Sequence, residues 1–167
     1  MADSDWEHRL TVAWASLDNV PDEEFLAAID ALAGELPAGD AIGLFERACA
    51  FDSTGHSDLA APLYTEALET GLTGIRRRRA VIQLASSLRN LGRPQESITL
   101  LTAERDAGSD ELDDAVLAFL ALAMTDAGRE RAAASIALGA LAPHLPRYQR
   151  SLANYASALL EPDGGGG

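Results

Sequence analysis

Hydrophobic residues recur at helical spacing at both ends of the chain, with polar residues between them. Two such apolar stripes lie within residues 4–40, namely Trp6, Leu10, Trp14 and Leu17, then Phe25, Ile29, Leu32 and Leu36. A third stripe lies near the end of the chain, at Tyr148, Leu152, Tyr155 and Leu159. Pro21 suits the first position of a helix, where its missing N–H costs nothing. The pattern therefore predicts a pair of helices over residues 4–40 and a last helix over residues 146–161.

The chain between these ends also lacks the signature of strands. Strict alternation of apolar and polar residues is absent, β-branched residues are few, and alanine, the best helix former, is abundant. The fold class predicted from the pattern is all-α. Residues 164–167 are four glycines with no side chains to pack, and we expect this tail to be disordered.

Three glycines divide the middle of the chain into similar units. Gly55, Gly92 and Gly128 each stand between two helical patterns, 37 and 36 residues apart. Glycine adopts a positive φ at a tight turn without steric cost. When the glycines are aligned, other positions come into register: Ala48, Ala85 and Ala121 seven residues before, Phe51, Leu88 and Met124 four before, Ala60, Ser97 and Ala133 five after, and Tyr64, Leu101 and Ala137 nine after.

These aligned positions resemble the tetratricopeptide repeat (TPR) family, in which each repeat is a helix hairpin with small residues at the helix contact. The resemblance assigns three repeats, over residues 41–72, 78–109 and 114–146. It implies a single TPR domain over residues 1–163. That domain would be a short right-handed superhelix flanked by the helix pair 4–40 and a capping helix 146–161. Arg47 and Glu104 depart from the apolar or small residues usual at their positions.

The charge of the chain narrows the classes of partner. The chain has 26 acidic residues and 13 basic residues, all of them arginine, so its net charge is −13. This charge argues against nucleic acid and against an anionic membrane surface as partners. No apolar run is long enough for a bilayer, and the N-terminus has no signal-peptide pattern, so we expect a cytoplasmic protein. Residues 76–107 are the exception, with seven arginines against three acids.

The sequence offers no catalytic, cofactor or metal site. The three histidines are far apart in the chain and lack the spacing of metal ligands. The single cysteine, Cys49, has no evident histidine partner, and phosphate-binding and hydrolase motifs are absent. We therefore predict that the protein is not an enzyme and needs no cofactor or metal.

The resemblance also implies where a protein partner would bind. In such repeats the first helix of each hairpin lines a concave groove. The lining residues with the most distinctive chemistry are Phe45, Cys49, Asp52, Arg79, Gln83, Ser86, Arg89, Asn90 and Leu122. The two arginines can hold a carboxylate, and the amides can hold a peptide main chain. The resemblance thus favours an adaptor that binds a peptide segment in its groove.

Three other interpretations are compatible with the sequence. Asp52, Arg79, Gln83 and Arg89 could bridge adjacent repeats as a structural network. The protein could instead be a homodimer anchored by aromatic residues of the flanking helices, Trp6, Trp14, Tyr148 and Tyr155, although we expect these four to seal the ends of the core. Finally, the acidic first 40 residues could lie over the basic segment and occupy the groove.

Overall fold

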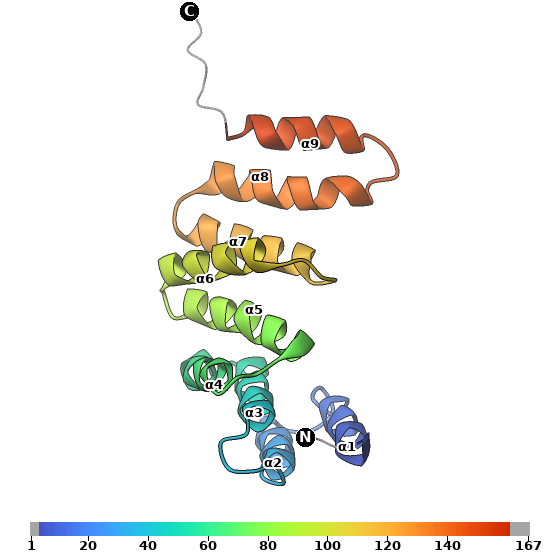
Figure 1. Ribbon diagram of the computed structural model, residues 1–167, viewed down its shortest axis with the longest axis vertical. Helices are drawn as coiled ribbons and strands as arrows, with labels where there is room; N and C mark the ends of the chain where they lie inside the picture. Colours follow the sequence, from blue (N-terminus) through green and yellow to red (C-terminus); the bar gives the residue numbers. More distant parts are fainter. Residues whose placement is uncertain (1–3, 161–167) are drawn as a thin grey trace, which may run out of the picture. The chain divides into compact units, whose positions relative to one another are not determined.

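The computed structural model describes residues 4–160, and within them every regular element is a helix (Figure 1). The helices run in the following order: α1 (Ser4–Trp14), α2 (Asp22–Ala33), α3 (Ala41–Ser53), α4 (Ser57–Glu69), α5 (Gly74–Asn90), α6 (Pro94–Ala107), α7 (Asp113–Asp126), α8 (Glu130–Leu141), a 3₁₀ turn (Ala142–His144) and α9 (Gln149–Ala158). The predicted all-α fold is confirmed. The glycine tail, residues 164–167, lies outside the described residues.

The chain divides into two compact units between Ser87 and Leu88, within α5. We call residues 4–87 the N-terminal unit and residues 88–160 the C-terminal unit. The sequence predicts a single domain and a superhelix. Both depend on how the two units are arranged relative to each other, so both stay predictions.

All three hairpin turns close with the same hydrogen bonds. Gly55, Gly92 and Gly128 have φ values of 84°, 74° and 72°. In each turn the N–H of the following residue donates to the carbonyl four residues before the glycine, with N···O distances of 2.8, 2.9 and 2.8 Å. These are the bonds of a helix C-terminus that reverses through a left-handed glycine. The glycine register read from the sequence is therefore confirmed at the level of the backbone.

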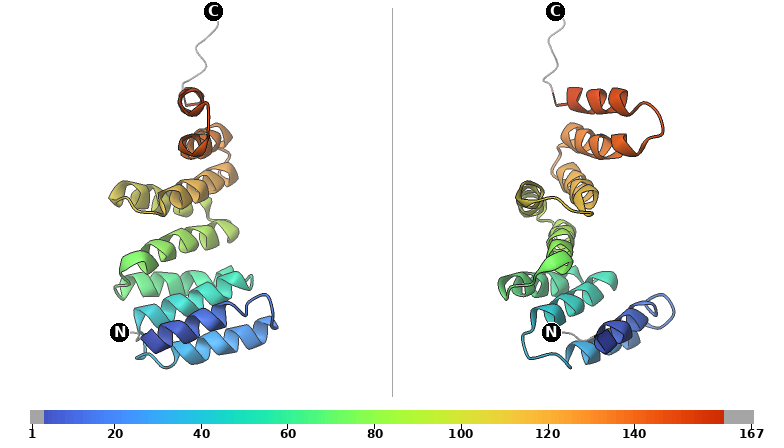
Figure 2. Two further views of the ribbon diagram at one scale, coloured as in Figure 1. Left: turned by 90° about the vertical axis from the view of Figure 1, so that its right-hand side faces the viewer. Right: turned by 45° about the vertical axis from the view of Figure 1, so that its right-hand side comes forward.

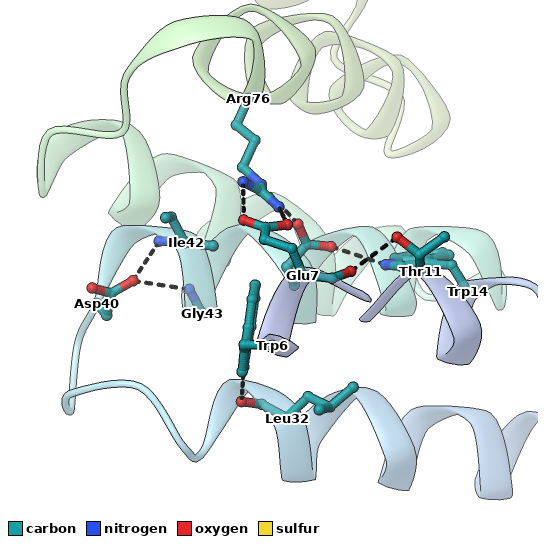
Figure 3. A network of polar contacts seen from close by, with 10 residues as sticks. Trp6, Glu7, Thr11, Trp14, Leu32, Asp40, Ile42, Gly43 and Arg76 are labelled. Atoms are coloured by element: carbon teal, nitrogen blue, oxygen red, sulfur yellow. Dashed lines mark hydrogen bonds and ion pairs between the residues drawn. The ribbon is translucent and has the colours of Figure 1, made fainter. Parts of the chain in front are cut away.

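Large side chains hold the N-terminal unit together. Phe25 and Ile29 of α2 are fully buried and pack with Trp6 and Leu10 of α1. The Trp6 indole N–H donates to the carbonyl of Leu32 over 2.9 Å, so its polar atom is satisfied inside the core (Figure 3). The two helices that carry this cluster, α1 and α2, lie side by side (Figure 2).

The junction between α2 and α3 shows why these residues begin a new helix. The Asp40 carboxylate accepts from the backbone N–H groups of Ile42 and Gly43 at 2.9 and 3.3 Å, which caps α3 (Figure 3). A side chain on Gly43 would meet the carbonyl of Ala33 at 3.3 Å. The glycine thus permits the close approach of α2 and α3.

Several predicted boundaries and one predicted burial pattern are wrong. Pro21 precedes α2 as its N-cap residue instead of opening it. The last helix begins at Gln149 instead of residue 146, and helix α5 begins at Gly74. Tyr148, whose φ is 68°, and Tyr155 are 75% and 72% exposed, so they do not seal the core as expected. Trp6 and the half-buried Trp14 do pack in it.

Candidate functional site

One face of α5 carries three polar side chains in helical register. Arg79, Gln83 and Ser86 stand at positions i, i+4 and i+7 and therefore lie along one side of the helix. All three belong to the N-terminal unit. The helix contains no acidic residue, so this face is cationic within an otherwise acidic chain. We call these three residues the α5 face.

The guanidinium of Arg79 is positioned by an aromatic ring and not by an acid. Its Cζ atom lies 5.2 Å from the centre of the Phe45 ring, a cation–π contact. Phe45 is fully buried, so Arg79 covers it and keeps its own charged end exposed. Within the described residues Arg79 forms no ion pair, which leaves its N–H donors available to a ligand.

Gln83 is oriented by two donors from beneath. The Cys49 thiol and the Tyr64 hydroxyl both donate to its Oε1 atom, at 3.0 and 2.8 Å. Burial raises the pKa of Cys49 to about 12 and raises that of Tyr64 as well, so both groups keep their protons at neutral pH. Both bonds engage the amide oxygen, and among residues 4–160 the NH₂ group of the half-exposed Gln83 has no hydrogen-bond partner.

Asp52 of α3 is bound by hydroxyl groups. Its Oδ1 accepts from Ser87 at 3.0 Å and from Ser57 at 3.4 Å. Burial raises the pKa of this carboxyl despite those two hydrogen bonds. Asp52 thus links α3, α4 and α5.

A second polar cluster, whose residues are not among the predicted site residues, ties α1, α3 and α5 together (Figure 3). Arg76 donates to both carboxylate oxygens of Glu7 at 3.0 and 2.7 Å and to Glu46 at 3.0 Å. The Trp14 indole N–H donates to the other oxygen of Glu46 at 3.0 Å. Glu46 is only 3% exposed. An acidic residue among the apolar residues of α3 was the sequence feature that could have indicated this buried ion pair. The run of arginines therefore begins with a structural residue.

A family model described as Tetratrico peptide repeat matches residues 41–159. The chain belongs to the tetratricopeptide repeat family. No curated protein and no solved structure matches it. The TPR family is typically a non-catalytic repeat module that mediates protein–protein interactions.

The structure distributes the predicted TPR site residues among three environments. Phe45 and Cys49, 0% and 1% exposed, support the α5 face from below and do not line a surface, contrary to expectation. Arg89 donates to Asp126 at 2.9 Å within the C-terminal unit. Asn90 is exposed near the end of α5, and Leu122 lies in an apolar groove of the C-terminal unit.

These contacts bear on the interpretations that the sequence left open. Asp52, Gln83 and Arg89 each bond to a neighbouring helix hairpin, as a structural network requires. Arg79 also contacts the neighbouring hairpin, through the Phe45 ring and not through an ion pair. Glu7 of the acidic N-terminal segment does contact the basic run, through Arg76.

None of the helices in residues 4–160 is long and apolar enough to cross a membrane. Over the same residues, no cluster of three or more histidine, cysteine or acidic side chains could hold a metal ion.

Proposed function

We propose that this TPR protein is an adaptor whose N-terminal unit binds a peptide carboxylate on the α5 face. Arg79 would hold the carboxylate, the NH₂ group of Gln83 would donate to it or to a main-chain carbonyl, and the Ser86 hydroxyl would bind beside them. The partner is a protein segment with an acidic side chain or a free C-terminus. Nucleic acid is disfavoured by the net charge of −13.

The fixed orientation of Gln83 is the observation that carries this proposal. A glutamine held at its oxygen by Cys49 and Tyr64 presents only donors outward, next to a guanidinium that has no acid partner among the described residues. Donors fixed before binding lose little conformational entropy when a ligand arrives. A surface of donors selects ligands rich in acceptors, and a carboxylate is the best acceptor in a peptide.

Peptide display against the whole protein would test the proposal. We expect selected peptides to carry a carboxylate, and we expect amidation or Gln/Asn replacement of that group to abolish binding. Arg79→Glu should raise the dissociation constant at least about tenfold, because a charge-assisted hydrogen bond is lost and a repulsion is added. Gln83→Glu keeps the acceptor for Cys49 and Tyr64 but removes the outward donor, so it should also weaken binding.

The matched control is Arg105→Glu, which changes an exposed arginine paired with Asp106 far along the sequence from α5. This variant should bind as the unchanged protein does. If Arg79→Glu and Arg105→Glu weaken binding equally, general charge explains the affinity and the α5 face is not the site.

A further inference from the structure

A shallow apolar groove of about 500 Å³ runs between α7 and α8 in the C-terminal unit. Its walls are small residues, among them Ala118 of α7 and Ala133, Ala134 and Ala137 of α8. Leu122 also lines it and is 45% exposed. The groove therefore exposes apolar surface to water, and a bulky side chain could cover this surface.

One groove residue, Ala137, differs in size from its counterparts in the repeat register. Nine residues after the turn glycine, the first repeat has Tyr64 and the second has Leu101, and both are fully buried. The third repeat has Ala137 at this position, and Ala137 is exposed. The third repeat therefore has a small exposed side chain where the first two repeats have a large buried one.

The same unit also carries two large apolar or aromatic side chains that are mostly exposed to solvent. Tyr155 of α9 is 72% exposed and Leu160 is 61% exposed. Helix α9 contains no acidic residue, although the chain as a whole has a charge of −13. Its one charged residue, Arg150, has no ion-pair partner among residues 4–160, and neither has Glu130, the one charged residue of the groove.

We propose that the groove is filled by a second copy of this chain, which inserts Tyr155 of its α9 beside Ala137 and sets Arg150 against Glu130. The size of the tyrosine matches the missing side chain, and the two charges are complementary. Because one chain carries both the groove and the inserted helix, each copy can serve the other in a two-fold symmetric dimer. Helices α8 and α9 lie side by side, so groove and helix are close enough to share one interface (Figure 2).

Two features favour a second copy over a foreign peptide. An acid-free helix lowers the repulsion between two strongly acidic molecules at the contact. One molecule also carries both an exposed tyrosine and an alanine-lined groove, so two copies can supply each other with an aromatic side chain and the groove that receives it. The dimer uses residues of the C-terminal unit and does not depend on the proposed α5 face.

Sedimentation velocity of the full chain over a range of concentrations would test the dimer. We expect a concentration-dependent species of twice the 17.6 kDa chain mass. Ala137→Tyr fills the groove from within, as Tyr64 does in the first repeat, and should raise the dimer dissociation constant at least about tenfold. Tyr155→Ser should have a similar effect. Both positions are exposed, so both variants should keep their helical circular dichroism.

Matched controls and a charge exchange sharpen this test. Ala27→Tyr and Val12→Ser change exposed residues of the N-terminal unit in the same ways and should leave the dimer unchanged. Glu130→Arg and Arg150→Glu should each weaken it, and the double variant should recover much of the loss. Arg79→Glu should dimerise normally, which separates this proposal from peptide binding.

Three results would overturn the proposal. The first is a chain that stays monomeric at the highest soluble concentration. The second is a dimer that folded Ala137→Tyr and Tyr155→Ser variants leave intact. The third is a monomer whose groove binds a foreign helical peptide, which would give the groove another occupant.

Discussion

The two units of this protein place their aromatic residues in opposite ways. In the N-terminal unit Trp6, Phe25, Phe45 and Tyr64 are buried, and Trp14 packs edge-on against Phe25 with ring centres 5.1 Å apart. In the C-terminal unit the core consists of smaller residues such as Leu101, Val116 and Leu120, while Tyr148 and Tyr155 face solvent. The N-terminal unit thus has aromatic rings in its core, whereas the C-terminal unit exposes these two tyrosines and only partly buries Phe119.

This difference has consequences for function. In the N-terminal unit the buried rings position a surface, because Phe45 supports Arg79 and Tyr64 fixes Gln83. In the C-terminal unit small residues line an open groove, and Tyr148 and Tyr155 are exposed. We therefore propose peptide binding for the N-terminal unit and self-association for the C-terminal unit.

Truncation of a buried ring gives the largest contrast between the units. Phe25→Ala should lower the free energy of unfolding by about 3–5 kcal/mol, because a fully buried ring leaves a cavity. Tyr155→Ala should change it by less than about 0.5 kcal/mol below the dimerisation range, since that ring is exposed. Urea denaturation measures both. Equal losses of unfolding free energy in the two variants would contradict the predicted difference between the two units.

Removal of Arg76 should have the next largest effect. Arg76→Ala leaves the buried Glu46 carboxylate without its cation, which should cost about 3 kcal/mol of unfolding free energy. The control is Arg93→Ala, because Arg93 pairs with Glu96 on the surface, where such a pair is worth less than about 1 kcal/mol. A small effect at Arg76 would show that water replaces the arginine.

Loss of one hydroxyl should show how Gln83 is held. Tyr64→Phe keeps the ring but removes a donor to Gln83, so the free energy of unfolding should fall by about 1 kcal/mol. Peptide affinity should fall a few-fold because Gln83 gains freedom. The two quantities are measured by denaturation and by fluorescence anisotropy. Unchanged affinity with reduced stability would mean that Gln83 does not contact the ligand.

The smallest predicted effect concerns pH. Burial raises the pKa of Asp52, so its protonated form is favoured in the folded state. Its stabilising contribution is therefore complete in acid and is lost as the pH rises through that raised pKa. Asp52→Asn keeps an acceptor for Ser57 and Ser87 without the charge. Urea denaturation across the acid range should show the variant gaining stability relative to the unchanged protein as pH rises, and an opposite trend would contradict the burial argument.

Local pattern predicted the helices and the turns well, because both depend on residues close in the chain. The three glycines, their register and the stripes of Trp6 and Phe25 all match the structure. The last helix was misjudged because its stripe of Tyr148 and Tyr155 has the right period but no neighbouring surface to cover it. Periodicity states which residues share a face, and it does not state whether anything packs there.

The candidate site was predictable in part for the same reason. The register placed Arg79, Gln83 and Ser86 together because one helix carries them. It could not show that Phe45 and Cys49 lie beneath them, since depth depends on α3 and α5 packing together. The Glu7–Arg76 contact joins residues 69 positions apart, a separation that no local pattern encodes.

The central claim, that Gln83 presents a fixed donor to a peptide, is tested most directly by its side-chain amide signal in an NMR titration. The chain has three glutamines, so Gln95 and Gln149 serve as internal references in the same spectrum. The account predicts that a carboxylate-bearing peptide from the display selection shifts the Gln83 NH₂ signals saturably, while the other two stay in place. The same peptide binding with the Gln83 signals unmoved would contradict it.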